Sequence, residues 1–211
     1  MKRILPLLLI ALALVGCKKD KYNFKEADLV GVWFCTEWEA NGPNPDISFW
    51  VNQDHTCMLR FGASEIHYFS WGINGNKLVF SGAPAIPEFT LKYLDKKHLD
   101  WIVTYDDGGQ ARASFANLSQ ILPGKWKSES LSLGNADITM DAAGTSTWVK
   151  GEAEPEIIKW SLESADTFAY PCIKWEGVNV DFADLFKVNS VTDNLISMYT
   201  SSSFLVTFTR E

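Results

Sequence analysis

The chain contains one pattern twice, and this internal repeat restricts its fold more than any other feature. Gly31-Val32-Trp33 returns as Gly124-Lys125-Trp126. Two further matches share an offset of 89 residues, namely Thr56 with Thr145 and Trp71 with Trp160. Both copies consist of short runs of alternating apolar residues, which favour strands over helices. The 211 residues of the chain are enough for two small domains, so we expect two copies of one β-domain.

Each copy is predicted to form about eight short strands and no helix. In the first copy, alternating runs predict strands at 30–38, 47–51, 56–61, 66–73, 78–80, 89–94, 99–105 and 111–118. In the second copy, the corresponding runs lie at 124–131, 138–140, 145–149, 157–162, 186–188, 195–199 and 204–209, with a longer excursion between 168 and 186. Closing such a meander removes its exposed edges. We therefore predict an all-β fold of two small antiparallel meander barrels in tandem.

The first sixteen residues have the pattern of a secretory leader. Lys2 and Arg3 precede an apolar stretch over 4–15, which is shorter than the roughly 20 residues that a membrane-spanning helix needs. Leu14-Val15-Gly16-Cys17 resembles the lipobox of bacterial lipoproteins, which implies that Cys17 carries a diacylglycerol. We expect a lipoprotein signal peptide at 1–16, a lipidated tether at 17–26, and domains at 27–119 and 120–211.

The two halves also resemble a known type of domain. Gly-x-Trp opens the first strand, Asp or Asn occupies the turn before a strand that starts with Thr, and Trp71-Gly72-Ile73 or Trp160-Ser161-Leu162 follows in mid-repeat. In this order the motifs resemble the lipocalin-like domains of bacterial lipoproteins. The resemblance implies lipocalin-like barrels with a binding role in the bacterial cell envelope, lipid-anchored to a membrane. The outer membrane is the expected one, with a periplasmic or surface-facing position.

The sequence has no pattern that is typical of an enzyme or a metal site. His55, His67 and His98 are not at metal-ligand spacing, and neither a nucleophile motif nor a phosphate-binding loop is present. We therefore expect a non-catalytic binding protein without cofactor or metal, whose ligand is a small apolar molecule, a glycan or a protein. The alternatives are a scaffold or interaction subunit of an envelope complex and a carboxylate-based hydrolase. The net charge of −7 argues against a nucleic-acid partner.

Three aromatic residues suggest where binding takes place. Trp33 and Cys35 define the inward phase of the first strand, so Phe34 and Trp38 should point outward. Trp50 should point outward from the next strand. Together, Phe34, Trp38 and Trp50 predict an exposed apolar patch that binds a ligand or a partner. Two alternatives stay open, namely packing of this patch against the second domain and contact with lipid.

After lipidation of Cys17, three cysteines remain, which leaves at least one thiol outside any intramolecular disulfide. Cys35 and Cys57 share the inward phase of their strands, so a bridge between them requires that the two strands be neighbours. The favoured interpretation of Cys35, Cys57 and Cys172 is that of small buried hydrophobic residues.

Overall fold

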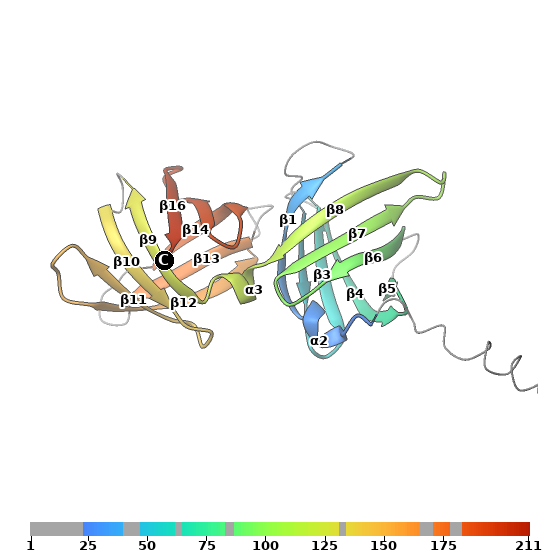
Figure 1. Ribbon diagram of the computed structural model, residues 1–211, viewed down its shortest axis with the longest axis horizontal. Helices are drawn as coiled ribbons and strands as arrows, with labels where there is room; N and C mark the ends of the chain where they lie inside the picture. The colour runs from blue at the N-terminus through green and yellow to red at the C-terminus, as the bar shows by residue number, and fades with distance from the viewer. Residues whose placement is uncertain are drawn as a thin grey trace, which may run out of the picture.

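The computed structural model describes residues 23–39, 47–61, 65–82, 87–130, 134–164, 171–177 and 183–211. The predicted signal peptide, Cys17 and most of the predicted tether lie outside the described residues. The described chain forms two closed antiparallel barrels of eight strands each, one after the other (Figure 1). In both barrels consecutive strands pair, and the last strand pairs with the first. The predicted all-β fold of two tandem barrels is thereby confirmed.

The elements of the first barrel are α2 (Glu26–Leu29), β1 (Gly31–Trp38), β2 (Ile47–Val51), β3 (Thr56–Phe61), β4 (Glu65–Asn74), β5 (Lys77–Ser81), β6 (Glu88–Leu94), β7 (His98–Thr104) and β8 (Gln110–Asn117). Those of the second are α3 (Leu118–Ile121), β9 (Gly124–Ser130), β10 (Gly134–Met140), β11 (Thr145–Lys150), β12 (Glu156–Ser164), β13 (Pro171–Gly177), β14 (Ala183–Val191), β15 (Leu195–Tyr199) and β16 (Leu205–Arg210).

Two details differ from the sequence prediction. The copies were expected to have no helix, but α2 and α3 each form one helical turn of four residues before a barrel. A helix of this length is too short to show an apolar period, and tertiary contacts stabilise it. The predicted excursion between 168 and 186 contains a strand, β13, which completes the second barrel between β12 and β14.

The repeated Gly-x-Trp motif builds the same local structure in both barrels. The indole N–H of Trp33 donates to the carbonyl of Leu29 at 2.6 Å, and that of Trp126 donates to Leu122 at 2.7 Å. The glycine two residues before each tryptophan has a φ of 143°, a conformation that favours glycine. A Cβ at either glycine would collide with a side chain from the end of the last strand. The motif thus ties the turn before each barrel to its first strand.

The mid-repeat tryptophans also make equivalent contacts. The indole N–H groups of Trp71 and Trp160 each donate at 3.1 Å to the backbone carbonyl nineteen residues earlier. The turn that they close contains Gly144 with a φ of 88° in the second barrel, and His55 with a φ of 64° in the first. Left-handed backbone costs free energy for a residue that has a Cβ. The stacking of its ring on Trp71, at a centroid distance of 4.9 Å, helps to offset that cost.

Aromatic side chains occupy the interior of both barrels. In the first barrel, the ring of Trp101 lies 4.5 Å from that of Phe115 and 4.8 Å from that of Phe89, measured between centroids. In the second barrel, the ring of Trp175 lies 4.3 Å from that of Trp148. All five side chains are buried. Because packed interiors tolerate little added volume, a ligand inside either barrel would have to displace these rings.

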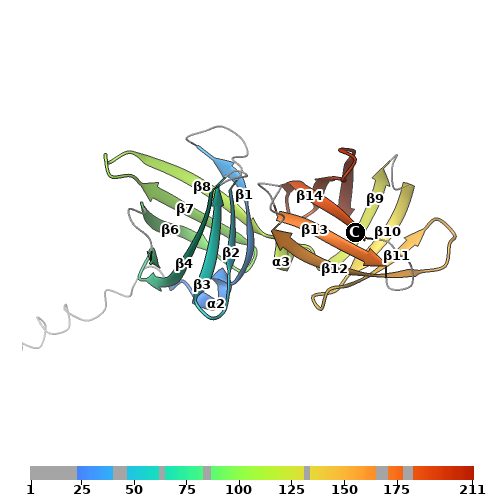
Figure 2. The ribbon, with the colours of Figure 1, turned by 180° about the vertical axis from the view of Figure 1, so that it is seen from behind.

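The barrels pack directly against each other. Val32 and Phe34 of β1 and Ala116 of β8 belong to the same hydrophobic cluster as Trp126 of the second barrel. Helix α3 lies between the barrels, and β1 is the strand of the first barrel that faces β14 (Figure 2). The outer face of β1 is therefore part of the apolar core that the second barrel builds.

The three described cysteines are buried, and none of them forms a disulfide. Strand β2 separates the strands that carry Cys35 and Cys57, so these two strands are not neighbours. Burial raises the pKa of both thiols to about 12. Cys35 and Cys57 are therefore protonated at neutral pH, as expected of small buried hydrophobic residues.

Candidate functional site

The three predicted aromatic residues do not form one exposed patch. Phe34 points outward but is only 1% exposed, because the second barrel covers it, as the alternative interpretation anticipated. Trp38 is 6% exposed and packs in the core of the first barrel. The register of β1 against β8 shifts between Cys35 and Glu37, and this bulge reverses the inward and outward phases. The prediction that Phe34 and Trp38 face water is therefore wrong, whereas Trp50 keeps partial exposure.

Trp50 lines a groove on the outer face of the first barrel. The groove has a volume of about 530 Å³ and is bordered by β2, β3, β4 and β5, and by the end of β12 from the second barrel. We name it the Trp50 groove, and its described lining residues are Trp50, Asn52, Thr56, Cys57, Met58, Tyr68, Phe69, Ser70, Ser81, Gly82 and Ser164. None of these described residues is charged at neutral pH.

One row of the groove is apolar. Trp50 lies directly opposite Met58 in the strand pairing, and Met58 lies opposite Tyr68. With about 4.8 Å between neighbouring strands, the row is about 10 Å long. Trp50 packs against the hydrophobic cluster that spans both barrels, while Tyr68 is 72% exposed. The row therefore has a fixed indole at one end and an accessible phenol at the other.

The neighbouring row carries hydroxyl groups. Thr56 lies opposite Ser70, and Ser70 lies opposite Ser81. This row runs beside the apolar row at a distance of about 7 Å, because every second residue of a strand faces the same side. The Thr56 hydroxyl donates to Asp54 at 2.6 Å, and this bond holds the pKa of the Asp54 carboxyl below its ordinary value. Within the described residues, the hydroxyls of Ser70 and Ser81 make no hydrogen bond, so both can face a ligand.

Polar contacts between the barrels hold the end of the groove. Arg60 is fully buried on β3 and donates to the hydroxyl of Ser164 at 2.9 Å. Elsewhere along the interface, Lys97 and His98 each approach the Asp193 carboxylate to 3.5 Å. Half-exposed polar contacts of this kind contribute little to stability. The buried Arg60 contact and the apolar cluster are therefore the main links that fix Ser164 against the first barrel.

The same face of the second barrel has a different chemistry. The positions that correspond to the two rows are Thr139, Thr147 and Ile157 in one, and Thr145, Lys159 and Glu176 in the other. Glu176 also pairs with Lys174 at 2.5 Å. The second barrel thus has charges where the first has free hydroxyls, and it has no aromatic residue in the equivalent row. The Trp50 groove is a feature of the first barrel alone.

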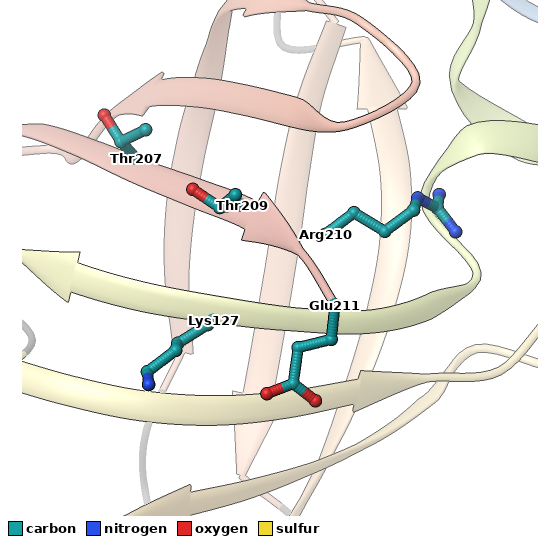
Figure 3. A pocket seen from close by; sticks show the side chains of 5 residues that line it. All are labelled: Lys127, Thr207, Thr209, Arg210 and Glu211. Atoms are coloured by element: carbon teal, nitrogen blue, oxygen red, sulfur yellow. The ribbon is translucent and has the colours of Figure 1, made fainter.

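Another hollow, of about 380 Å³, lies along β9 and β16 (Figure 3). Figure 3 shows the Arg210 side chain extending away from Lys127 and Glu211. Its guanidinium donates to the backbone carbonyls of Ile121 and Pro123. These hydrogen bonds stabilise the segment before β9. The hollow lacks the combination of an aromatic surface and free hydroxyls that the Trp50 groove has.

The sequence prediction missed Met58, Tyr68, Ser70 and Ser81. The sequence indicated in part that these residues face outward, because they alternate with the inward-facing Cys57, Phe69 and other apolar residues of their strands. Their alignment into rows depends on the register between strands, which alternation within one strand does not contain.

Tandem eight-stranded antiparallel barrels are consistent with a lipocalin-like architecture. No family model matches the chain, and no curated protein matches it in sequence. In the described parts of the chain, no three or more His, Cys, Asp or Glu side chains are grouped so that they could hold a metal ion. None of the described helices is long and apolar enough to cross a membrane. The function must therefore be argued from the groove and from the sequence of the leader.

Proposed function

We propose that this protein is a lipid-anchored, non-catalytic binding protein of the bacterial cell envelope, and that it holds an uncharged ligand in the Trp50 groove. The observation that carries the proposal is the apolar row of Trp50, Met58 and Tyr68 beside free hydroxyls, at the boundary between two domains. Ligand sites typically combine apolar surface with a few directed polar groups, and they are common at domain boundaries.

Binding rather than turnover fits the side chains that line the groove. Catalysis of acyl, glycosyl or phosphoryl transfer needs a poised acid, base or nucleophile next to the substrate. Among the described lining residues, Cys57 is the one thiol, and a thiol attacks as its thiolate. Burial raises its pKa to about 12, so it is protonated at neutral pH and unsuited to nucleophilic attack.

The membrane anchor is argued from the apolar leader and the residues Leu14-Val15-Gly16-Cys17. The described chain begins at Asn23, shortly before α2. Six residues from Cys17 to Asn23 can extend at most about 20 Å. A lipid on Cys17 would therefore keep the first barrel, which contains the groove, close to the membrane surface.

Replacing Cys17 with serine is expected to release the protein from the membrane, because the hydroxyl is not a substrate for thioether lipidation. After fractionation of cells that express the full chain, the wild-type protein should sediment with membranes and the Cys17→Ser variant should not. Mass spectrometry should find the lipid on the wild type alone. Lys18→Ala serves as the matched control and should behave as the wild type. The anchor on Cys17 would be contradicted by a Cys17→Ser variant that stays in the membrane fraction and has a mass that still includes the lipid.

Removal of both aromatic ends of the groove is expected to weaken binding of any uncharged ligand by about tenfold or more, since each aromatic face contributes on the order of 1 kcal/mol. The measurement is a fluorescence titration of the full chain with three neutral probes, namely a fatty-acid methyl ester, an aromatic alcohol and a gluco-oligosaccharide. The Trp50→Ala/Tyr68→Ala variant is compared with Tyr199→Ala, which removes an exposed tyrosine from the second barrel. The proposal fails if no probe binds, or if binding is equal in both variants.

A further inference from the structure

We infer that the Trp50 groove binds a neutral oligosaccharide of at least disaccharide length, with sugar rings on Trp50 and Tyr68 and sugar hydroxyls directed at Ser70 and Ser81. This inference rests on the proposed binding function and specifies the ligand class. Four features of the groove carry it, namely its two-row surface, its length, its lack of described charges and its single occurrence in the chain.

The two-row surface matches the two surfaces of a pyranose. One face of the sugar ring presents C–H groups, which pack on the π-face of an aromatic side chain. The rim of the same ring presents hydroxyl groups, which need hydrogen-bond partners. In the groove, the apolar row meets the first need, and the free hydroxyls of Ser70 and Ser81 meet the second. A wholly apolar ligand would leave the second row unused.

The length of the apolar row argues for more than one sugar unit. Trp50 on β2 and Tyr68 on β4 are two strands apart, which corresponds to about 10 Å. A single pyranose reaches only one of the two aromatic side chains, whereas a disaccharide reaches both. Trp50 packs against the hydrophobic cluster that spans both barrels, so one platform is ordered before the ligand arrives, which lowers the entropic cost of binding.

The distribution of charge argues for a neutral glycan. An anionic sugar would need a cation in the groove, and the described lining residues include neither lysine nor arginine. Arg60, two residues from Met58 on β3, is fully buried and donates to the hydroxyl of Ser164. The equivalent face of the second barrel carries Lys159 and Glu176 and lacks the aromatic row, so the expected stoichiometry is one oligosaccharide per chain.

The test is a calorimetric titration of the full chain with neutral gluco-oligosaccharides of one to four units, in both α-1,4 and β-1,4 linkages. Oligomers of uronic acids of the same lengths are the charged comparison. We expect affinity to rise about tenfold or more from the monomer to the dimer in at least one linkage, and to rise less thereafter. The uronic-acid oligomers should bind about tenfold more weakly or not at all.

Single variants then locate the sugar in the groove. Tyr68→Ala should weaken binding by about tenfold, and Tyr68→Phe should retain most of it, because the ring face is kept. Ser70→Ala and Ser81→Ala should each weaken binding by about three- to tenfold, as expected for one hydrogen bond. Tyr199→Ala, which changes an exposed residue of the second barrel, should bind as the wild type does.

Two results would overturn the inference and leave the proposed function intact. One is that the ester or the aromatic alcohol binds in a manner that depends on Trp50 and Tyr68, while no neutral oligosaccharide binds. The other is that oligosaccharides bind equally well to wild type and Tyr68→Ala, which would place the sugar outside the groove, while the ester or the aromatic alcohol still binds in a manner that depends on Trp50 and Tyr68. If none of the neutral probes binds, the proposed function fails as well.

Discussion

Phe34→Asp is expected to separate the two barrels while leaving each of them folded. Phe34 is 1% exposed and belongs to the hydrophobic cluster of the second barrel. Loss of a buried phenylalanine side chain costs about 3–5 kcal/mol, and a carboxylate placed in an apolar interface adds a desolvation penalty of several kcal/mol. Separation of the barrels is the response with the smallest cost in free energy, because neither barrel interior contains this side chain.

The measurement for Phe34→Asp combines urea unfolding with small-angle X-ray scattering. The wild type should unfold in one transition, because the barrels share a cluster, and the variant should show two transitions and a larger radius of gyration. The matched control is Lys127→Ala, which changes the corresponding position of the repeat. Lys127 is exposed, so this variant should lie within about 0.5 kcal/mol of the wild type. A Phe34→Asp protein with the wild-type midpoint and radius would contradict the described interface.

Arg210→Ala is expected to lower the free energy of unfolding by about 2–4 kcal/mol. The guanidinium carbon of Arg210 lies 4.4 Å from the ring centroid of Trp126. The guanidinium also donates to the carbonyls of Ile121, Pro123 and Asp193. The variant loses the cation–π contact and leaves these partly buried carbonyls without their donor.

Urea unfolding followed by tryptophan fluorescence measures this loss as a lower midpoint at an unchanged slope. Arg210→Lys keeps the charge but not the planar fork, so its stability should lie closer to that of Arg210→Ala than to that of the wild type. Thr209→Ala, at an exposed position on the same strand, is the control and should change stability by less than about 0.5 kcal/mol. An Arg210→Ala protein as stable as this control would show that the Arg210 contacts do not hold the barrel.

Much of the fold could be predicted because its causes are local. Ile47–Val51, Thr56–Phe61 and Leu195–Tyr199 were predicted with the bounds that the strands have in the structure. Alternating apolar residues and turn-forming clusters are both readable within a few residues of chain. The repeat of Gly-x-Trp then indicated that the same local structure occurs twice. The equivalent indole hydrogen bonds of Trp33 and Trp126 agree with it.

The orientation of Trp38 could not be predicted, because it depends on the neighbouring strand. Its outward phase followed from uninterrupted alternation after Trp33, and the bulge against β8 breaks that alternation. Strand β13 was missed for a related reason, since it is stabilised by pairing with β12 and β14 along its length. Strand pairing is a contact between distant residues, so a single run of sequence contains little information about it.

The sequence alone determined that the chain forms two closed β-modules, and its leader predicts the lipid anchor. Only the tertiary structure decided which outward side chains meet solvent. Phe34 and Lys127 occupy corresponding positions, yet the second barrel buries the first and leaves the second exposed. Likewise, Trp50, Met58 and Tyr68 form one surface only through the register of three strands. Alternation sets the side of the sheet on which a residue lies, but what covers that side depends on segments far away in the chain.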